Sequence, residues 1–422
     1  MSDPLRITLI HTADHGGGAE ASVVSLHNAL LELGHQSNLY VGTKHTQLPH
    51  VHAIQRHRCI PGVLRTAKWA EDRLGWQYVY HPWFRKLDRK FRDHADVIHF
   101  HSLWSGRLGY ADVGGLPRLS RLFPSLMTLR DMWMLSGHCA YPAVDCDRWK
   151  TGCGQCPDLS LAPAIDVDGT AHNWQRKRKM IQRSNIRVIT VSDWLRQQVQ
   201  SCPIFDNTPV FTVYNGLDEG VFCTGNQQQA RSQLNIPSDA FVVMLAGQSV
   251  EGTFNRGGGA VDFALQALDL NKPDVFPLFV GHSASAVATR WGQPCRALPF
   301  QTPADLATCY RAANLTLVAS QRETFGRIPA ESQLCGTPVV AFRNGGLTEV
   351  VMHEQTGLLV DDEDAVGLGA AVQQLNRSRE QLAEFSAQAA QSAAKRFGNA
   401  AIATAYVDHY RSVIRERSQD RH

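Results

Sequence analysis

The sequence lacks three features that would place it in a membrane, secreted or nucleic-acid-binding class. No run of about eighteen apolar residues is present, which excludes a membrane-spanning helix of the usual length. The first twenty residues contain Asp3, Asp14 and Glu20 and no apolar core typical of a secretory signal, so we expect a cytoplasmic protein. Lys and Arg number 42 against 39 Asp and Glu, and a net charge of +3 is too small to favour nucleic acid.

A second absence, that of internal repeats and long low-complexity linkers, favours compact domains. A chain of 422 residues is too long for one ordinary core, so two domains of roughly 200 residues are expected. Short apolar runs alternate with helical patterns in both halves, which is typical of a mainly parallel α/β sheet in each. We predict two doubly wound, Rossmann-like domains facing a cleft. Residues 1–205 form the first, which the C-terminal helix 398–422 completes, and residues 206–397 form the second.

Strand-like runs place the elements of each half. In the first half, residues 7–10 precede a glycine turn at 16–18 and a helical pattern at 22–33, which is the start of a βαβ unit. Further strands are predicted at 96–100, 188–191 and 210–213, and in the second half at 241–247, 277–280, 315–318 and 338–342. The stretch 379–417 is rich in Ala and Gln and nearly free of Gly and Pro, which predicts helix.

Four cysteines lie close together in the segment 130–160, at Cys139, Cys146, Cys153 and Cys156. The final pair has the C-x2-C spacing that holds one tetrahedral metal, and two further thiolates would complete a closed site. In a cytoplasmic protein such a cluster more often binds metal than forms disulfides. We predict a structural Zn²⁺ site, with His138 as a reserve ligand and disulfides or free thiols as the alternatives.

The stretch from Ser320 to Glu331 carries the candidate chemistry. It follows a predicted strand and leads into a predicted helix, with Pro329 in the first turn and Gly336 at the helix end. Its loop therefore lies at the carboxyl end of a strand, where open α/β sheets bind ligands. Amides at the helix start favour a diphosphate, and Glu331, expected in the first turn, can accept hydrogen bonds from sugar hydroxyls. Surface carboxylates that match by chance are the alternative.

The spacing of Glu323 and Glu331, with an internal Phe-Gly, resembles the retaining glycosyltransferases of family 4, which have the GT-B fold. The resemblance covers nearly the whole chain, and its other parts are Gly16-Gly17-Gly18-Ala19-Glu20, Tyr214-Asn215-Gly216-Leu217-Asp218 and Asn344-Gly345-Gly346-Leu347-Thr348-Glu349-Val350. The cysteine segment is similar to a subgroup found in exopolysaccharide gene clusters, including the colanic-acid type. The resemblance implies sugar transfer from a nucleotide-diphosphate sugar to a lipid-linked oligosaccharide at the cytoplasmic face of the inner membrane.

The resemblance also implies roles for single residues. Glu323 would contact hydroxyls of the donor sugar, and Glu331 would hold the ribose. The remaining donor-binding positions are Thr324, Phe325, Gly326, Gly17, Gly18 and Asn215. Family members usually supply a cation to the leaving diphosphate from the loop after the first strand of the second domain. In this chain that loop, 247–259, lacks the expected Arg near Gln248 and offers only Arg256.

A further departure from the family pattern lies in the first domain. Many relatives have His where this chain has Arg130, which cannot act as a general base and could contact a phosphate or the acceptor instead. Asp131 either orients Arg130 or caps a turn. His99 and His101 alternate on a strand end and face one side, so they could line the cleft or be core or surface histidines.

Retention without an obvious nucleophile implies transfer on one face of the sugar, with the departing phosphate oxygen taking the proton of the acceptor. No catalytic metal is expected, because no D-x-D pair is convincing as a metal site: Asp145 and Asp147 match the pattern but lie among the predicted zinc ligands. A nucleotide-sugar 2-epimerase and a catalytically inactive scaffold are the alternative functions for this fold.

Residues 56–92 combine basic and aromatic side chains. The basic residues are Arg56, Arg58, Arg65, Lys68, Arg73, Arg85, Lys86, Arg89, Lys90 and Arg92. They are interleaved with the aromatic residues Trp69, Trp76, Tyr78, Tyr80, Trp83 and Phe84. The combination suits peripheral contact with anionic lipid headgroups, which would bring the first domain to a lipid-linked acceptor. A solvated helical face with a few buried aromatics is the alternative.

Overall fold

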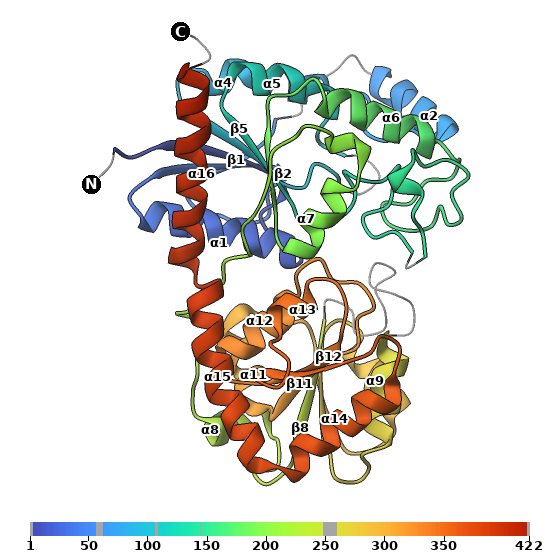
Figure 1. Ribbon diagram of the computed structural model, residues 1–422, viewed down its shortest axis with the longest axis vertical. Coiled ribbons are helices and arrows are strands. Elements are labelled where there is room, and N and C mark those ends of the chain that lie inside the picture. The colour runs from blue at the N-terminus through green and yellow to red at the C-terminus, as the bar shows by residue number, and fades with distance from the viewer. Residues whose placement is uncertain (1–2, 56–61, 106–108, 144, 248–259, 420–422) are drawn as a thin grey trace. The chain divides into compact units, whose positions relative to one another are not determined.

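Two parallel β-sheets form the framework of the computed structural model, which describes residues 3–55, 62–105, 109–143, 145–247 and 260–419 (Figure 1). The chain divides into a first unit, residues 1–216 with 402–422, and a second unit, residues 217–401. Each sheet is covered by helices that follow its strands, as expected for βαβ crossovers. Two doubly wound α/β domains were predicted, and this fold class is confirmed.

The first unit has a seven-stranded sheet in the order β3-β2-β1-β4-β5-β6-β7. Its strands are β1 (Arg6–Ala13), β2 (Gln36–Thr43), β3 (Val51–Ala53), β4 (Val97–Phe100), β5 (Ser125–Leu129), β6 (Arg187–Thr190) and β7 (Val210–Thr212). Its α-helices are α1 (Gly18–Glu32), α2 (Val63–Leu74), α3 (Pro82–Arg85), α4 (Leu87–Phe91), α5 (Leu116–Leu122), α6 (Thr170–Ile181) and α7 (Asp193–Gln200). The strand order reverses between β1 and β4, where ligands of open α/β sheets usually bind.

The second unit has a six-stranded sheet in the order β10-β9-β8-β11-β12-β13. Its strands are β8 (Val242–Ala246), β9 (Phe276–Val280), β10 (Arg296–Leu298), β11 (Leu315–Val318), β12 (Val339–Phe342) and β13 (Gly357–Val360). Its helices are α8 (Gln227–Leu234), α9 (Ala260–Asp269), α10 (Ala284–Trp291), α11 (Pro303–Ala312), α12 (Arg327–Leu334), α13 (Leu347–Val350), α14 (Ala365–Arg377) and α15 (Arg379–Phe397). Here the strand order reverses between β8 and β11.

The boundary between the units differs from the predicted 205/206. Strand β7 follows that boundary in the sequence, but it pairs with β6 in the first sheet, so the first unit continues to Gly216. The turn signal that follows β7 indicates where the chain enters the second unit more accurately than the apolar pattern on which the predicted boundary rested.

The predicted C-terminal helix is present as two helices, α15 and α16 (Asn399–Gln419), which are separated at Gly398. From Ile402 onward the chain belongs to the first unit, where Tyr406 and Tyr410 of α16 lie in the core with residues of β1 and β2. In Figure 1, α16 runs alongside the first sheet. Burial of these tyrosines explains why the helix returns to the first unit.

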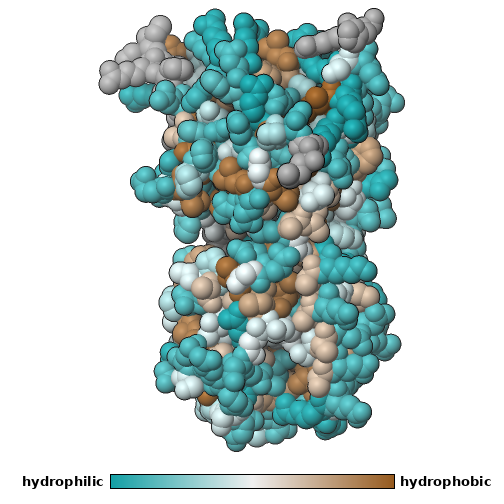
Figure 2. All heavy atoms as spheres, turned by 90° about the vertical axis from the view of Figure 1, so that its left-hand side faces the viewer, coloured by the Kyte–Doolittle hydropathy of each residue, from teal (hydrophilic) through white to brown (hydrophobic). Residues whose placement is uncertain are grey.

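The surface is mainly polar in the view of Figure 2, where hydrophobic side chains form separate groups among hydrophilic ones. Each unit has its own buried hydrophobic cluster, one formed around β1, β2, α1 and α16 and one around β8, β11 and β12. Among the described residues, no helix has the length and apolar character needed to cross a membrane.

Candidate functional site

The loop between β11 and α12 places the Glu323–Glu331 motif at the carboxyl end of a central strand of the second sheet. Glu323, Thr324 and Phe325 are nearly fully buried, and the ring of Phe325 packs edge-on against Phe397 with 5.4 Å between centroids. Gly326 precedes the helix with a φ of 97°, a left-handed conformation that favours glycine. The predicted strand, loop and helix are therefore present in that order.

Two neighbouring glycines let the loop after β12 pack onto the backbone of this motif. Gly346 N donates to Glu323 O at 2.8 Å. A Cβ at Gly345 would lie 2.1 Å from Glu323 O, and one at Gly346 would lie 2.6 Å from Thr324 O. Side chains at these positions would push the loops apart, so the Gly345-Gly346 pair fixes the position of Glu323.

Glu331 lies in the second turn of α12, because the helix begins at Arg327; the predicted first-turn position is wrong by one turn. Glu331 is 4% exposed, and its carboxylate is held from two sides. Arg327 Nε lies 2.6 Å from Oε1, and the Tyr310 hydroxyl donates to Oε2 at 3.1 Å. Burial raises the pKa of Glu331, while Arg327 and Tyr310 oppose that shift.

Tyr310 and Arg327 are the residues of this region that sequence reasoning missed. Burial, followed by the charge of Glu331, raises the pKa of Tyr310 far above its usual value, so the phenol stays protonated and donates to the carboxylate. The four-residue separation of Arg327 and Glu331 was a usable signal, since such pairs meet on one helix face. Nothing in the sequence marked Tyr310, which α11 brings to the site.

The first unit gathers polar side chains at its own strand reversal. His11 lies near the end of β1, His101 follows β4 and Arg130 follows β5. Arg130 is 7% exposed, and its Nη1 donates to Asn215 Oδ1 at 2.9 Å. Two positions predicted from separate motifs, Arg130 and Asn215, are thus in direct contact.

The three histidines of this cluster are buried and differ in their partners. His99 is a core histidine, because its nitrogens contact the Tyr410 hydroxyl and Thr128 Oγ1, both at 2.7 Å. Among the described residues, neither ring nitrogen of His11 or His101 has a hydrogen-bond partner. Burial, assisted by the charge of Arg130, lowers the pKa of His11 to about 3 and that of His101 well below its usual value. Both imidazoles are therefore neutral near pH 7.

The glycine turn after β1 is organised by Glu20. Gly17 precedes α1 and Gly18 begins it, and Gly17 N donates to Glu20 Oε2 at 2.8 Å. The other oxygen of Glu20 lies 3.7 Å from His11 Nε2, which is too long for a hydrogen bond. The Gly17 amide predicted for donor binding thus has an internal acceptor in this structure.

Asp131 caps a turn, which is one of its two predicted roles. Its oxygens accept from Trp133 N at 2.9 Å and from Trp104 Nε1 at 2.8 Å. Arg256 lies in 248–259, outside the described residues, so its predicted contact with the diphosphate stays a prediction.

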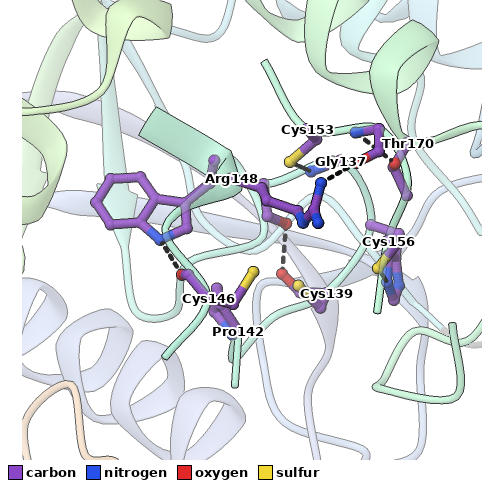
Figure 3. A pocket seen from close by; sticks show the side chains of 12 residues that line it. Gly137, Cys139, Pro142, Cys146, Arg148, Cys153, Cys156 and Thr170 are labelled. Atoms are coloured by element: carbon purple, nitrogen blue, oxygen red, sulfur yellow. Dashed lines mark hydrogen bonds between the residues drawn. The ribbon is translucent and has the colours of Figure 1, made fainter. Parts of the chain in front are cut away.

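The four cysteines of the segment 130–160 line one cavity, together with His138 (Figure 3). All four are free thiols. In the part of the chain that the structure describes, no group of three or more His, Cys, Asp or Glu side chains is already arranged to hold a metal ion. The zinc prediction is therefore untested.

The basic and aromatic segment 56–92 has a mixed surface in its described part, residues 62–92. Tyr78, Trp83 and Phe84 are buried, which agrees with the alternative of a helical face over buried aromatics. Trp69 on α2 is 67% exposed and Tyr80 is 37% exposed. Only part of the aromatic set could therefore meet a lipid surface.

Two family models match the chain. One described as "Glycosyltransferase Family 4" matches residues 16–220, and one described as "Glycosyl transferases group 1" matches residues 261–392. Each match falls largely within one of the two units.

Curated relatives include two D-inositol 3-phosphate glycosyltransferases of Catenulispora acidiphila. D-inositol 3-phosphate glycosyltransferase 2 is 34% identical over 336 residues, which cover 76% of this chain and 71% of the relative. D-inositol 3-phosphate glycosyltransferase 1 is 29% identical over 334 residues, covering 76% and 72%.

Solved structures resemble the whole chain in fold. Sucrose-phosphate synthase from Thermosynechococcus elongatus has a TM-score of 0.71 at 20% identity, covering 97% of this chain and 99% of its own. Anabaena HepE, solved in complex with UDP and glucose, has a TM-score of 0.68 at 19% identity, covering 97% and 100%. These similarities confirm the predicted GT-B fold class.

Proposed function

Because the chain belongs to glycosyltransferase family 4, we propose that it moves a sugar from a nucleotide-diphosphate sugar to an acceptor hydroxyl, with retention of configuration. The observation that carries this proposal is the arrangement around Glu331. A buried carboxylate held by Tyr310 and Arg327 lies in α12, the helix that follows the Glu323 loop at a strand's carboxyl end. Such an arrangement suits a donor with vicinal hydroxyls and a diphosphate.

The second unit is proposed to bind the donor. Each oxygen of Glu331 has one protein partner and can accept a second hydrogen bond, which a ribose hydroxyl would supply. Glu323 is proposed to contact hydroxyls of the transferred sugar. Amides at the start of α12 favour the anionic diphosphate, and Arg256 is proposed as the cation that stabilises the leaving group.

The transfer step breaks the bond between the anomeric carbon and the diphosphate oxygen and forms a bond to the acceptor oxygen on the same face. The acceptor proton passes to the departing phosphate oxygen. The protein supplies orientation and stabilises the negative charge that develops on the leaving group, which is the larger share of such catalysis. Arg130 has no role as a base in this scheme, because its guanidinium keeps its protons.

The first unit is proposed to bind the acceptor at its strand reversal. His11 and His101 are neutral there and can accept hydrogen bonds from acceptor hydroxyls, and Arg130 can donate to an anionic group. Burial of unpaired ring nitrogens has a cost, and a polar ligand or water would remove it.

We propose a lipid-linked oligosaccharide of surface polysaccharide assembly as this acceptor. The similarity of the cysteine segment to exopolysaccharide enzymes supports it, as do exposed Trp69 and Tyr80 among the basic residues of 62–92. Four or five cations near an anionic surface, each contributing about 1 kcal/mol, suffice for reversible attachment.

A phosphorylated polyol is a second candidate acceptor. The relatives named D-inositol 3-phosphate glycosyltransferases favour it, and Arg130 offers a guanidinium suited to a phosphate. The two candidate acceptors are different substrates, but both are proposed to bind at the same strand reversal of the first unit.

A donor screen tests the proposed reaction. UDP-glucose and other nucleotide sugars are incubated with the enzyme, alone and with either a lipid-linked oligosaccharide extract or inositol phosphate. Acceptor-dependent release of nucleotide, with product of the donor's anomeric configuration by NMR, is expected. Interconversion of the nucleotide sugar without acceptor would instead indicate a 2-epimerase, and no turnover of any donor would favour an inactive scaffold.

Vesicle co-sedimentation separates the two acceptor classes further. Binding to vesicles with anionic lipid at low salt, and release at high salt, is expected if residues 62–92 bring the enzyme to a membrane. The variant Trp69→Ser should weaken binding, whereas Val366→Ser, which removes another exposed apolar side chain, should not. Equal, negligible sedimentation in both salts would leave the soluble polyol phosphate as the better candidate.

A further inference from the structure

The cysteine cavity lies outside the proposed donor and acceptor sites and has a distinct chemistry. Cys139, Cys146, Cys153 and Cys156 surround a cavity of about 20 Å³, which is large enough for one atom or ion. Figure 3 shows their side chains around this space. Four sulfur donors around a space of that size match the donor set of a closed tetrahedral zinc site.

The backbone around the C-x2-C pair is shaped for close approach to a sulfur. Residues 152–155 all have positive φ, including 56° at Cys153 and 49° at Gln155, which non-glycine residues rarely adopt. The turn is fixed from outside: Gly154 N donates to Thr170 Oγ1 at 2.9 Å, and Cys156 N donates to Asp168 Oδ2 at 2.8 Å. Such conformations persist where the surroundings determine them, often at a ligand site.

An amide already points at one sulfur of the set. Gly137 N donates to Cys153 Sγ at 3.2 Å, a contact that a thiolate accepts better than a thiol because it carries full negative charge. His138 Nε2 lies 3.3 Å from Cys156 Sγ. The segment 137–139 thus contributes an amide, a reserve ligand and Cys139 to one side of the cavity.

A buried cation lies beside the cavity. Lys177 is 2% exposed, and its Nζ donates to Trp133 O at 2.5 Å and to Ser136 O at 3.0 Å. Its ammonium lies 3.6 Å from the centroid of the Trp133 ring and interacts electrostatically with Cys139 and Cys153. A divalent metal with four thiolates carries two net negative charges, and a buried ammonium stabilises such an anion.

We propose that Cys139, Cys146, Cys153 and Cys156 bind one Zn²⁺ as a closed structural site. Each thiol loses its proton to solvent as its sulfur binds the metal, so four protons are released per ion. Cys156 Sγ donates to Asp158 O at 3.4 Å, and this bond must be replaced when the sulfur turns to the metal. The described side chains do not already form a metal-binding group, so metal binding requires them to rotate toward the ion.

Hydrogen bonds connect the cysteine site to the loop after β5 and to α6. Ala140, next to Cys139, accepts a hydrogen bond from Met132 N at 2.8 Å, and Met132 is two residues from Arg130. Trp149 Nε1 donates to Cys146 O at 3.0 Å, and Trp174 Nε1 donates to Trp149 O at 2.9 Å, which joins the segment to α6. The metal would therefore hold the loop after β5, and with it Arg130, against the first unit.

Metal analysis of the full chain, purified with a thiol reductant after growth with zinc, tests the proposal. About one zinc per chain is expected, released in full by an organomercurial reagent that modifies the thiols. Less than about one third of an equivalent, or iron in place of zinc, would overturn the assignment. Under non-reducing conditions, a protein mass lower by two hydrogen atoms for each pair of cysteines would indicate disulfides. That result would also overturn the assignment.

Matched variants locate the site. Cys153→Ser is expected to lower the zinc content severalfold, whereas Cys295→Ser, at a half-buried thiol of the second unit, should leave it unchanged. Because Cys153→Ser could prevent folding, the wild-type chain is also reconstituted with Co²⁺. Thiolate-to-cobalt charge-transfer absorption is expected from that sample, and its absence, with no zinc bound, would rule out a thiolate site.

Discussion

The two units place polar residues at the same topological position but assemble them in opposite ways. In the second unit, Glu323, Arg327 and Glu331 come from one stretch of nine residues after β11. In the first unit, His11, His101, Arg130 and Asn215 come from four separate segments around β1, β4, β5 and β7. A site built from one local motif can be read from a sequence, whereas a site built across a sheet can be recognised only after folding.

The two clusters also differ in how their polar groups are satisfied. Both oxygens of Glu331 have protein partners, so that site is held in place by the protein alone. His11 and His101 are buried without hydrogen-bond partners among the described residues. A buried polar group without a partner costs about 1–3 kcal/mol, which a ligand or ordered water can offset. The second unit is therefore expected to be organised before donor binding, and the first to be stabilised by its ligand.

The largest expected effect concerns Glu323. Glu323→Gln keeps the side-chain shape and removes the charge, and kcat/KM should fall by about 10²-fold or more, as for loss of a group aimed at the transition state. Affinity for the free nucleotide, measured by calorimetry, should stay nearly unchanged. Glu380→Gln, at an exposed site on α15, is the control and should behave as wild type. Normal turnover by Glu323→Gln would remove this residue from the reacting site.

The next effect tests whether Glu331 holds the nucleotide. Glu331→Gln removes a charged acceptor, and affinity for the nucleotide diphosphate should weaken by about 1–3 kcal/mol. Tyr310→Phe removes only the contact at 3.1 Å and should weaken it by less. Calorimetric titration measures both, with Tyr80→Phe, at an exposed tyrosine, as control. An unchanged affinity in Glu331→Gln would show that the ribose binds elsewhere.

A smaller effect separates the first unit from the second. Arg130→Gln should raise the KM for the acceptor about tenfold and leave nucleotide affinity unchanged, because one charged hydrogen-bond donor is lost. Arg130→Lys keeps the charge but loses the planar donor to Asn215, so a partial effect is expected. Arg415→Gln, at an exposed arginine of α16, serves as control. Loss of nucleotide binding in Arg130→Gln would instead assign Arg130 and Asn215 to the donor.

The smallest expected effect is the loss of folding stability that the buried histidines cause at acidic pH. Burial lowers the pKa of His99 well below its usual value. As the pH falls through about 6.5, His99 therefore takes up a proton in the unfolded chain but not in the folded chain. Its stabilising contribution is complete above pH 6.5 and is lost as the pH falls. Each such histidine should lower the free energy of unfolding by about 0.7 kcal/mol between pH 7 and pH 6.

Denaturant unfolding at pH 7 and at pH 6 measures this change in the free energy of unfolding of the first unit. His99→Gln should reduce the pH dependence, and His94→Gln, at an exposed histidine, should leave it unchanged. The same slope in wild type and His99→Gln would mean that His99 takes up its proton without unfolding.

The predicted elements that were confirmed have strong local patterns. The runs 7–10, 241–247 and 338–342 became β1, β8 and β12, and 379–417 became α15 and α16. Strand β2 was not predicted, because it opens with Gln36, Ser37 and Asn38, which favour strands poorly. Pairing with β1 and β3 on its two sides overrides that local preference.

The sequence by itself determined the α/β class, the two-unit organisation, and the order of Glu323, Gly326 and Glu331 along one strand, loop and helix, because periodicity and short-range spacing carry that information. Only the tertiary structure decided that β7 joins the first sheet, that Tyr310 supports Glu331, and that Arg130 contacts Asn215 beside buried neutral histidines. These contacts join residues from 21 to 85 positions apart. Such pairs are set by strand order and burial, which emerge when distant segments pack into one core.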